Sequence, residues 1–363
     1  MASELHQQVS LMLDRERGAL AEAITARQYE LQPELIARYG AAGRARCLQD
    51  ASYHLSYLSE SVAATAPGLF ADYVAWAQVM LETRGVPAAD LARNLEVMRG
   101  ILQQQLAPEL AAVASEYLES GMQQLSLPQA SAPSVLREHE AAQPLTGLAR
   151  EYLDALMRGE RHVASRLVLE AVEGGTSVKD VYLRVFQAAQ HEIGRLWQMN
   201  RLSVAQEHYC TAATQLIMSQ LYPHIFAGEK NGHTLVATCV SGDLHEIGVR
   251  MVSDFFEMEG WDTFYLGANV PAQSIVQTLI ERRADVLAVS ATMTYHVRAV
   301  KHLISVVRSS ELCRETKILV GGYPFNLAPE LWREVGADAC ARDAAQAISL
   351  ANQFVGAEGA SLN

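Results

Sequence analysis

The apolar and polar positions of the 363-residue chain follow one period in its N-terminal part and another in its C-terminal part. Before residue 229 the apolar side chains recur every three or four positions, which predicts amphipathic helices. Proline and glycine interrupt this pattern and predict about four helices within residues 1–125. The clearest apolar stripe is formed by Leu91, Leu95, Met98 and Leu102.

Two helical regions are separated by a stretch of different composition. Residues 126–147 contain several prolines and few large apolar groups, and we interpret them as a linker. Residues 148–228 return to the helical pattern and are predicted to form a four-helix domain. Thr176 or Ser177 is expected to cap one of its helices.

From residue 229 to residue 363 short apolar runs alternate with helical stretches. Alternation at this spacing predicts a parallel sheet with right-handed crossovers, in a Rossmann-like (flavodoxin-like) domain. The fold class is therefore multidomain, α followed by α/β. The predicted strands are 234–239, 263–266, 286–290 and 318–320, and the predicted helices are about 246–259, 272–283, 296–309 and 328–335.

Composition and charge narrow the possible functions. Half of the residues are hydrophobic and 19% are charged, which indicates a globular chain. The net charge of −12 argues against a nucleic-acid-binding surface. The 5 cysteines are scattered and form no CxxC pair, and we find neither an apolar signal region nor a membrane-length apolar run. We therefore expect a cytoplasmic protein without a membrane span.

Three short elements of the C-terminal domain follow one spaced pattern. Each falls at or just after the carboxyl end of a predicted strand, where parallel sheets bind their ligands. A neutral imidazole is a good metal ligand, and a carboxylate two residues earlier can fix its tautomer. The elements are Asp243-x-His245-x-x-Gly248, then after 41 residues Ser290, then after 30 more Gly321-Gly322.

This pattern resembles the signature of base-off/His-on cobalamin-binding domains. The resemblance implies that His245 holds cobalt from below, that Asp243 orients it, and that Ser290 hydrogen-bonds the buried dimethylbenzimidazole. Thr292 stands where the family usually has Leu, which changes the tail pocket. The alternative is a Rossmann-like domain whose loop histidine caps a helix and whose glycines are ordinary turns. The residues implied around the cofactor tail are Gly248, Ser290, Thr292, Gly321 and Gly322.

A second spaced feature lies in the helical region before the sheet, where Trp197 is followed after nine residues by Glu207-His208. Trp-x9-Glu-His resembles the signature of the cobalamin-based light-sensing repressors of carotenoid synthesis. The resemblance implies that Trp197 covers the 5′-deoxyadenosyl group of adenosylcobalamin and that Glu207 contacts it. It also implies that His208 takes the upper cobalt position after light. The alternative is a core tryptophan beside a solvent-facing Glu-His pair.

Residues 1–125 show no helix-turn-helix pattern with a basic recognition helix, but they contain arginines close to an aromatic cluster. One interpretation is the aromatic core of a helical bundle, with His54 at its edge. The other is a bilin site, because the overall arrangement resembles the photocobilins, which bind biliverdin beside adenosylcobalamin. Cys47 is then a conceivable thioether site. The candidate bilin residues are Arg44, Arg46, Tyr53, His54 and Tyr57.

The sequence therefore leads us to expect a cobalamin photoreceptor, and no enzyme, that changes its domain or oligomer packing in light. Its expected partners are further copies of itself or a downstream signalling protein. Two alternatives stay open. One is a corrinoid carrier that passes methyl groups between methyltransferases, and the other is a cobalamin-dependent antirepressor without a bilin.

Overall fold

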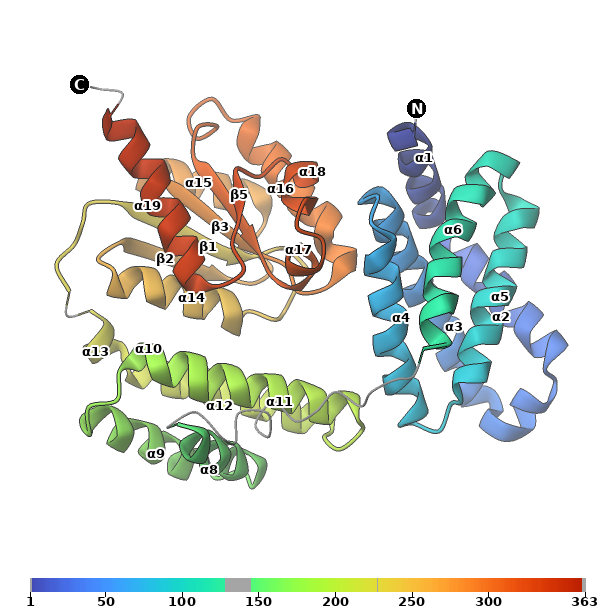
Figure 1. The fold of residues 1–363 in the computed structure, drawn as a ribbon, viewed down its shortest axis with the longest axis horizontal. Coiled ribbons are helices and arrows are strands. Elements are labelled where there is room, and N and C mark those ends of the chain that lie inside the picture. The colour runs from blue at the N-terminus through green and yellow to red at the C-terminus, as the bar shows by residue number, and fades with distance from the viewer. Residues whose placement is uncertain (1, 128–144, 227, 361–363) are drawn as a thin grey trace. The chain divides into compact units, whose positions relative to one another are not determined.

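The computed structural model describes residues 2–127, 145–226 and 228–360 (Figure 1). By its internal contacts the chain divides into two compact units. The helical unit contains the described residues up to 127 together with Met293–Arg298 and Tyr323–Val335. The sheet unit contains the other described residues. Most of the predicted linker lies outside the described residues.

Six α-helices form the N-terminal part of the helical unit within the described residues. The prediction of about four helices was wrong because two helix starts at prolines were overlooked. Helix α3 begins directly after Pro33 and helix α6 begins at Pro108, a residue well suited to a first helical turn. The helices are α1 (Ala2–Arg15), α2 (Arg17–Leu31), α3 (Glu34–Ala63), α4 (Pro67–Glu82), α5 (Ala88–Gln105) and α6 (Pro108–Leu125).

The helical unit has its own apolar core, and short segments from much later in the chain help to cover it. Met293 and Tyr295 pack against this core, and the Tyr323 hydroxyl donates a hydrogen bond of 2.8 Å to Asp72. The predicted stripe on α5 lies in the same core. The later segments are the 3₁₀-helix η2 (Thr294–His296), α17 (Tyr323–Leu327) and α18 (Leu331–Val335).

The first part of the sheet unit is the predicted four-helix domain. Three of its elements, α10, η1 and α11, run on without a break, so they form one composite helix beside α8, α9 and α12. Ser177 caps this composite helix by accepting the Asp180 N–H at 3.1 Å. The elements are α8 (Thr146–Met157), α9 (Arg161–Glu173), α10 (Val178–Val181), the π-helix η1 (Tyr182–Phe186), α11 (Gln187–Gln198), α12 (Val204–Gln220) and α13 (Tyr222–Ile225).

A five-stranded parallel sheet follows, with the strand order β2-β1-β3-β4-β5. This is the doubly wound, flavodoxin-like order. Strand β2 is added on one side of β1, whereas β3, β4 and β5 are added on the other side. The predicted fold class is confirmed. The short strand β5 was not predicted, because two residues carry no readable alternation. The strands are β1 (Thr234–Cys239), β2 (Asp262–Gly267), β3 (Val286–Ser290), β4 (Lys317–Gly321) and β5 (Ala339–Cys340).

Helices cover both faces of the sheet, as right-handed crossovers require (Figure 1). Helices α14 and α19 contribute to one apolar cluster against β1, β3 and β4. Met251 and Phe255 of α14 also belong to the core of the four-helix domain, so the two parts of the sheet unit share apolar packing. None of the described helices is long and apolar enough to cross a membrane. The helices are α14 (Ile247–Met258), α15 (Ala272–Arg282), α16 (Val297–Arg308) and α19 (Ala344–Ala360).

The turn after β4 depends on glycine at one position. Gly322 has φ of 105°, and a Cβ built there would lie 2.0 Å from the carbonyl oxygen of Ala291. Both the backbone conformation and the close approach of the loop that follows the neighbouring strand β3 exclude a side chain. Gly321 is less restricted, since its Cβ would lie 3.1 Å from the carbonyl oxygen of Ala341.

We therefore expect Gly322→Ala to lower the free energy of unfolding of the full chain by about 2–4 kcal/mol, through strain and overpacking. Gly100→Ala is the matched control, because Gly100 lies inside α5 with open space around its Cβ position. It should raise stability by roughly 0.5–1 kcal/mol. Urea unfolding of both variants measures the difference, and equal stabilities would contradict the packing described for Gly322.

Candidate functional site

A buried carboxylate organises the loop between β1 and α14. Asp243 is 1% exposed, and its Oδ1 accepts hydrogen bonds from the His245 ring Nδ1 at 2.7 Å and from the His245 backbone N–H at 3.1 Å. Its Oδ2 accepts the backbone N–H of Thr292 at 2.5 Å. One carboxylate therefore fixes a histidine ring and joins the loops that follow β1 and β3.

The His245 ring is presented outward by this arrangement. Its side chain is 59% exposed, and the hydrogen bond to Asp243 raises the pKa of the imidazole, while burial lowers it. Because Nδ1 is engaged by the carboxylate, Nε2 is the nitrogen left for a ligand. Leu244, which is 65% exposed, adds an apolar surface beside it. An oriented imidazole next to an exposed apolar side chain suits a metal held in a large organic ring.

The other elements of the lower motif lie at the carboxyl ends of neighbouring strands. Ser290 ends β3 and is paired in register with Cys239 of β1 and with Gly321 of β4. Gly248 lies in the first turn of α14, and nothing stands within 4 Å of its Cβ position. The sheet thus brings the Asp243–His245 loop and Ser290 to the same edge, with open space at Gly248.

The upper residues come from two helices of the four-helix domain. Trp197 lies in the last turn of α11 and packs, partly buried, against the core of that domain. Glu207 and His208 lie in the first turns of α12, where Glu207 Oε2 is 2.5 Å from His208 Nδ1. The His208 side chain is 70% exposed. The Glu207 carboxylate also raises the pKa of His245, after the larger effect of Asp243.

Three further polar residues in this region were not predicted. Thr211 donates a hydrogen bond of 3.0 Å to Glu207, and Gln215 donates one of 2.8 Å to Glu246 in the loop beside His245. Glu207, Thr211 and Gln215 recur at every fourth position and therefore share one face of α12. This spacing of polar residues on α12 is the sequence signal that could have revealed Thr211 and Gln215.

The candidate bilin residues do not all come together. His54 is 3% exposed and its Nδ1 lies 2.7 Å from the Tyr73 hydroxyl, while burial lowers the pKa of the imidazole to about 4. Its placement at the edge of the aromatic core was wrong, because it lies inside. Tyr57 stacks on Tyr73 with ring centroids 3.6 Å apart. Tyr53, in contrast, is 46% exposed.

The two arginines lie further along the surface of α3. Arg44 and Arg46 are both exposed, and the Arg44 guanidinium lies 5.9 Å from the centre of the Tyr29 ring. Cys47 is a free, partly buried cysteine, and burial raises the pKa of its thiol to about 11. The arginines are available to an anionic ligand, whereas the Cys47 thiol is not activated as a nucleophile.

Comparison with known families agrees with this geometry. Residues 233–351 match a B12-binding domain, and residues 148–222 match a second model of that name, so both parts of the sheet unit are covered. Residues 6–125 match the family of phycobilisome proteins.

Similar proteins point to the same class. A dimethylamine corrinoid protein of Methanosarcina barkeri is 26% identical over 214 residues, covering 57% of this chain and 97% of that protein. A corrinoid protein of Desulfitobacterium hafniense is 27% identical over 58% of this chain and 99% of its own length. The monomethylamine corrinoid protein of Methanosarcina barkeri shares the fold over 58% of this chain and 99% of its own, with a TM-score of 0.52 and 23% identity.

The site and the matches together define a protein with B12-binding domains. More particularly, they support a cobalamin-binding protein with a bilin-related N-terminal region. The roles of the individual residues stay predictions.

The Asp243–His245 hydrogen bond gives a direct test of the lower site. We expect Asp243→Asn to lower the pKa of His245, because the ring loses the carboxylate that favours its protonated form. Loss of such a partner should also weaken hydroxocobalamin binding by about 10–100-fold. Histidine NMR titration of the apo protein and absorbance titration with cobalamin measure the two effects.

Glu281→Gln is the control, because this carboxylate lies on α15 and bonds only to neighbouring Gln277 in the contacts described. It should leave both measurements unchanged. A His245 pKa that stays the same in Asp243→Asn would contradict the orienting role of Asp243.

Proposed function

We propose that the protein is an adenosylcobalamin photoreceptor with biliverdin as a second chromophore in its N-terminal region. The observation that carries this proposal is the pairing of Glu207 with an exposed His208 on α12, in the same unit as the outward-facing His245. Trp197 completes the Trp-x9-Glu-His spacing. The match to phycobilisome proteins supports the second chromophore.

Adenosylcobalamin, when bound, would supply a cobalt–carbon bond that light breaks. His245 would hold the cofactor from below through Nε2, and Ser290 would contact its displaced tail. Trp197 would cover the upper side with an apolar ring, and Glu207 would accept hydrogen bonds from ribose hydroxyls. The proposal is supported by the positions of these groups, which lie at the carboxyl ends of the strands, on α11 or on α12.

The upper histidine is suited to a role that begins only after light. His208 is 70% exposed and held by Glu207, so its ring is free to leave one partner for another. Movement of His208 toward the cofactor would displace the start of α12. That helix is tied to the loop beside His245 through Gln215 and Glu246. We infer that its displacement changes how the domains pack.

A change in packing acts as a signal only when another molecule recognises the altered surface. We propose that this molecule is a second copy of the chain or a downstream signalling protein, and that the protein itself catalyses no reaction. The 5 cysteines are all free, which supports a reducing compartment such as the cytoplasm.

Illumination of the protein loaded with adenosylcobalamin tests the proposal. Green or blue light should replace the adenosylcobalamin spectrum by that of a bis-histidine complex. In His208→Ala the adenosyl group should still be lost, but the bis-histidine spectrum should fall to less than about a tenth, because the upper ligand is missing.

His224→Ala is the matched control, since His224 is an exposed histidine of the short helix α13. It should behave as the unchanged protein does. A bis-histidine spectrum of full amplitude in His208→Ala would refute the upper-ligand role. A loaded protein that is stable in light would refute the photoreceptor itself.

The bilin is tested separately with the full chain. Biliverdin should give a red absorption band, and the double variant Arg44→Ala, Arg46→Ala should bind it about 10-fold more weakly, because charge-assisted contacts to the propionates are lost. Arg15→Ala, an exposed arginine of α1 paired with neighbouring Glu16, is the control. Absence of a red band in the unchanged protein would remove the bilin from the proposal.

A second function is favoured by the similar proteins, which are named corrinoid proteins, one of them a dimethylamine corrinoid protein. In that case the chain would carry a methyl group on cobalt and hand it to a methyltransferase. The two functions differ in a single observation, since the carrier needs no light-driven change in spectrum or assembly.

A further inference from the structure

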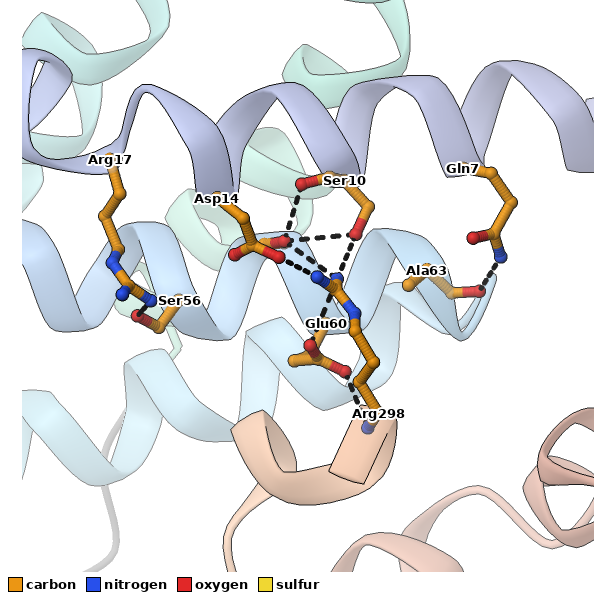
Figure 2. Close-up of polar contacts among 9 residues, drawn as sticks. Gln7, Ser10, Asp14, Arg17, Ser56, Glu60, Ala63 and Arg298 are labelled. Carbon is orange, nitrogen blue, oxygen red and sulfur yellow. Dashed lines mark hydrogen bonds and ion pairs between the residues drawn. The ribbon is translucent and has the colours of Figure 1, made fainter. Parts of the chain in front are cut away.

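A single arginine from the second half of the chain is held by the N-terminal helices. Figure 2 shows the Arg298 guanidinium directed between the side chains of Asp14 on α1 and Glu60 on α3. It forms ion pairs with both carboxylates, the one to Glu60 at 3.1 Å. It also donates to the hydroxyls of Ser10 and Ser59, which lie 3.1 Å from each other. Five polar groups thus converge on one point of the helical unit.

The backbone of the same residue takes part in this contact. The Arg298 N–H donates to Glu60 Oε2 at 3.1 Å, in the first turn of α16, where helix N–H groups have no partner within the helix. The Glu60 side chain is 7% exposed. Burial raises the pKa of Glu60 to about 8, while the Arg298 N–H opposes this rise. A carboxylate buried this deeply depends on its partner, so the contact holds the segment firmly.

The segment that ends at Arg298 begins at the lower cofactor site. Thr292, directly before it, donates its N–H to the Asp243 carboxylate that orients the candidate metal ligand. Within the segment, Tyr295 meets the ring of Tyr57 edge-on, with centroids 5.2 Å apart. Met293–Arg298 therefore runs without interruption from the Asp243 carboxylate to the aromatic and acidic groups of α3.

We propose that Arg298 is a positioning residue that couples cobalamin binding at His245 to the packing of α1 and α3. The coupling passes through Thr292 and the short backbone between these two anchored ends. It is reciprocal, because a contact that orders the segment favours both sites. The inference rests on the proposed cobalamin site, and its test separates the failure of one from the failure of the other.

The test compares hydrogen exchange of the full chain with and without hydroxocobalamin. Cobalamin should slow exchange in the loop at 243–250 and also in residues 7–14 and 54–62. In Arg298→Met the protection of 7–14 and 54–62 should be lost, whereas that of 243–250 should remain. Hydroxocobalamin binding should weaken by about 5-fold or more, the lower end of typical couplings between sites.

Arg17→Ala is the matched control, because Arg17 donates a hydrogen bond of 3.0 Å to Ser56 on the same helix α3 and has no contact with the segment in Figure 2. In this variant hydroxocobalamin should slow hydrogen exchange in residues 7–14 and 54–62 as much as it does in the unchanged protein. Arg298→Lys and Glu60→Gln, which alter the contact more gently, serve the same comparison if Arg298→Met does not fold. In both variants hydroxocobalamin should protect residues 7–14 and 54–62 from exchange less than it does in the unchanged protein.

Two results overturn the coupling. One is an unchanged protein that binds hydroxocobalamin and protects 243–250 without protecting 7–14 and 54–62. The other is an Arg298 variant in which hydroxocobalamin protects residues 7–14 and 54–62 from exchange as fully as it does in Arg17→Ala. A protein that gives no base-off spectrum with hydroxocobalamin at all would instead refute the cobalamin site on which the inference rests.

Discussion

The Asp243 carboxylate is the interaction on which the rest of the site depends. It is buried, and it accepts hydrogen bonds from the imidazole of His245, from the backbone N–H of His245 and from the backbone N–H of Thr292. A buried charge is tolerable only when hydrogen bonds replace its water, and these donors do so. The same bonds fix the tautomer of the histidine and hold the loops after β1 and β3 together. One carboxylate therefore both orients the candidate metal ligand and holds the two loops together.

The helix above this edge is organised by similar means. Glu207, Thr211 and Gln215 form a polar stripe on α12, and Gln215 reaches Glu246 beside the lower histidine. Hydrogen bonds of this kind are directional, so a small rotation of α12 would break them. Apolar contacts depend less on angle and would weaken gradually. Helix α12 is joined to the sheet by a shared apolar core and by the hydrogen bond from Gln215 to Glu246.

Much of this could be predicted from the sequence, since the signals were periodic or fixed in spacing. The strands β1 to β4 and the loop around His245 lie where alternation and motif place them. The number of N-terminal helices could not be predicted, because the breaks at Pro33 and Pro108 interrupt the pattern only briefly. The contact of Arg298 with Glu60 joins residues 238 positions apart, and no local pattern carries such information.

The helical unit is completed by segments that are translated much later than its N-terminal helices. Met293–Arg298 and Tyr323–Val335 belong to it, although the rest of its residues end at 127. During synthesis the N-terminal helices therefore emerge long before Arg298 can neutralise Glu60 or Tyr295 can cover Tyr57. Such distant pairings slow folding, because a long loop must close before the contacts form. The N-terminal region consequently reaches its final packing only after strands β1 to β4 have been made, which ties its maturation to that of the cobalamin-binding part.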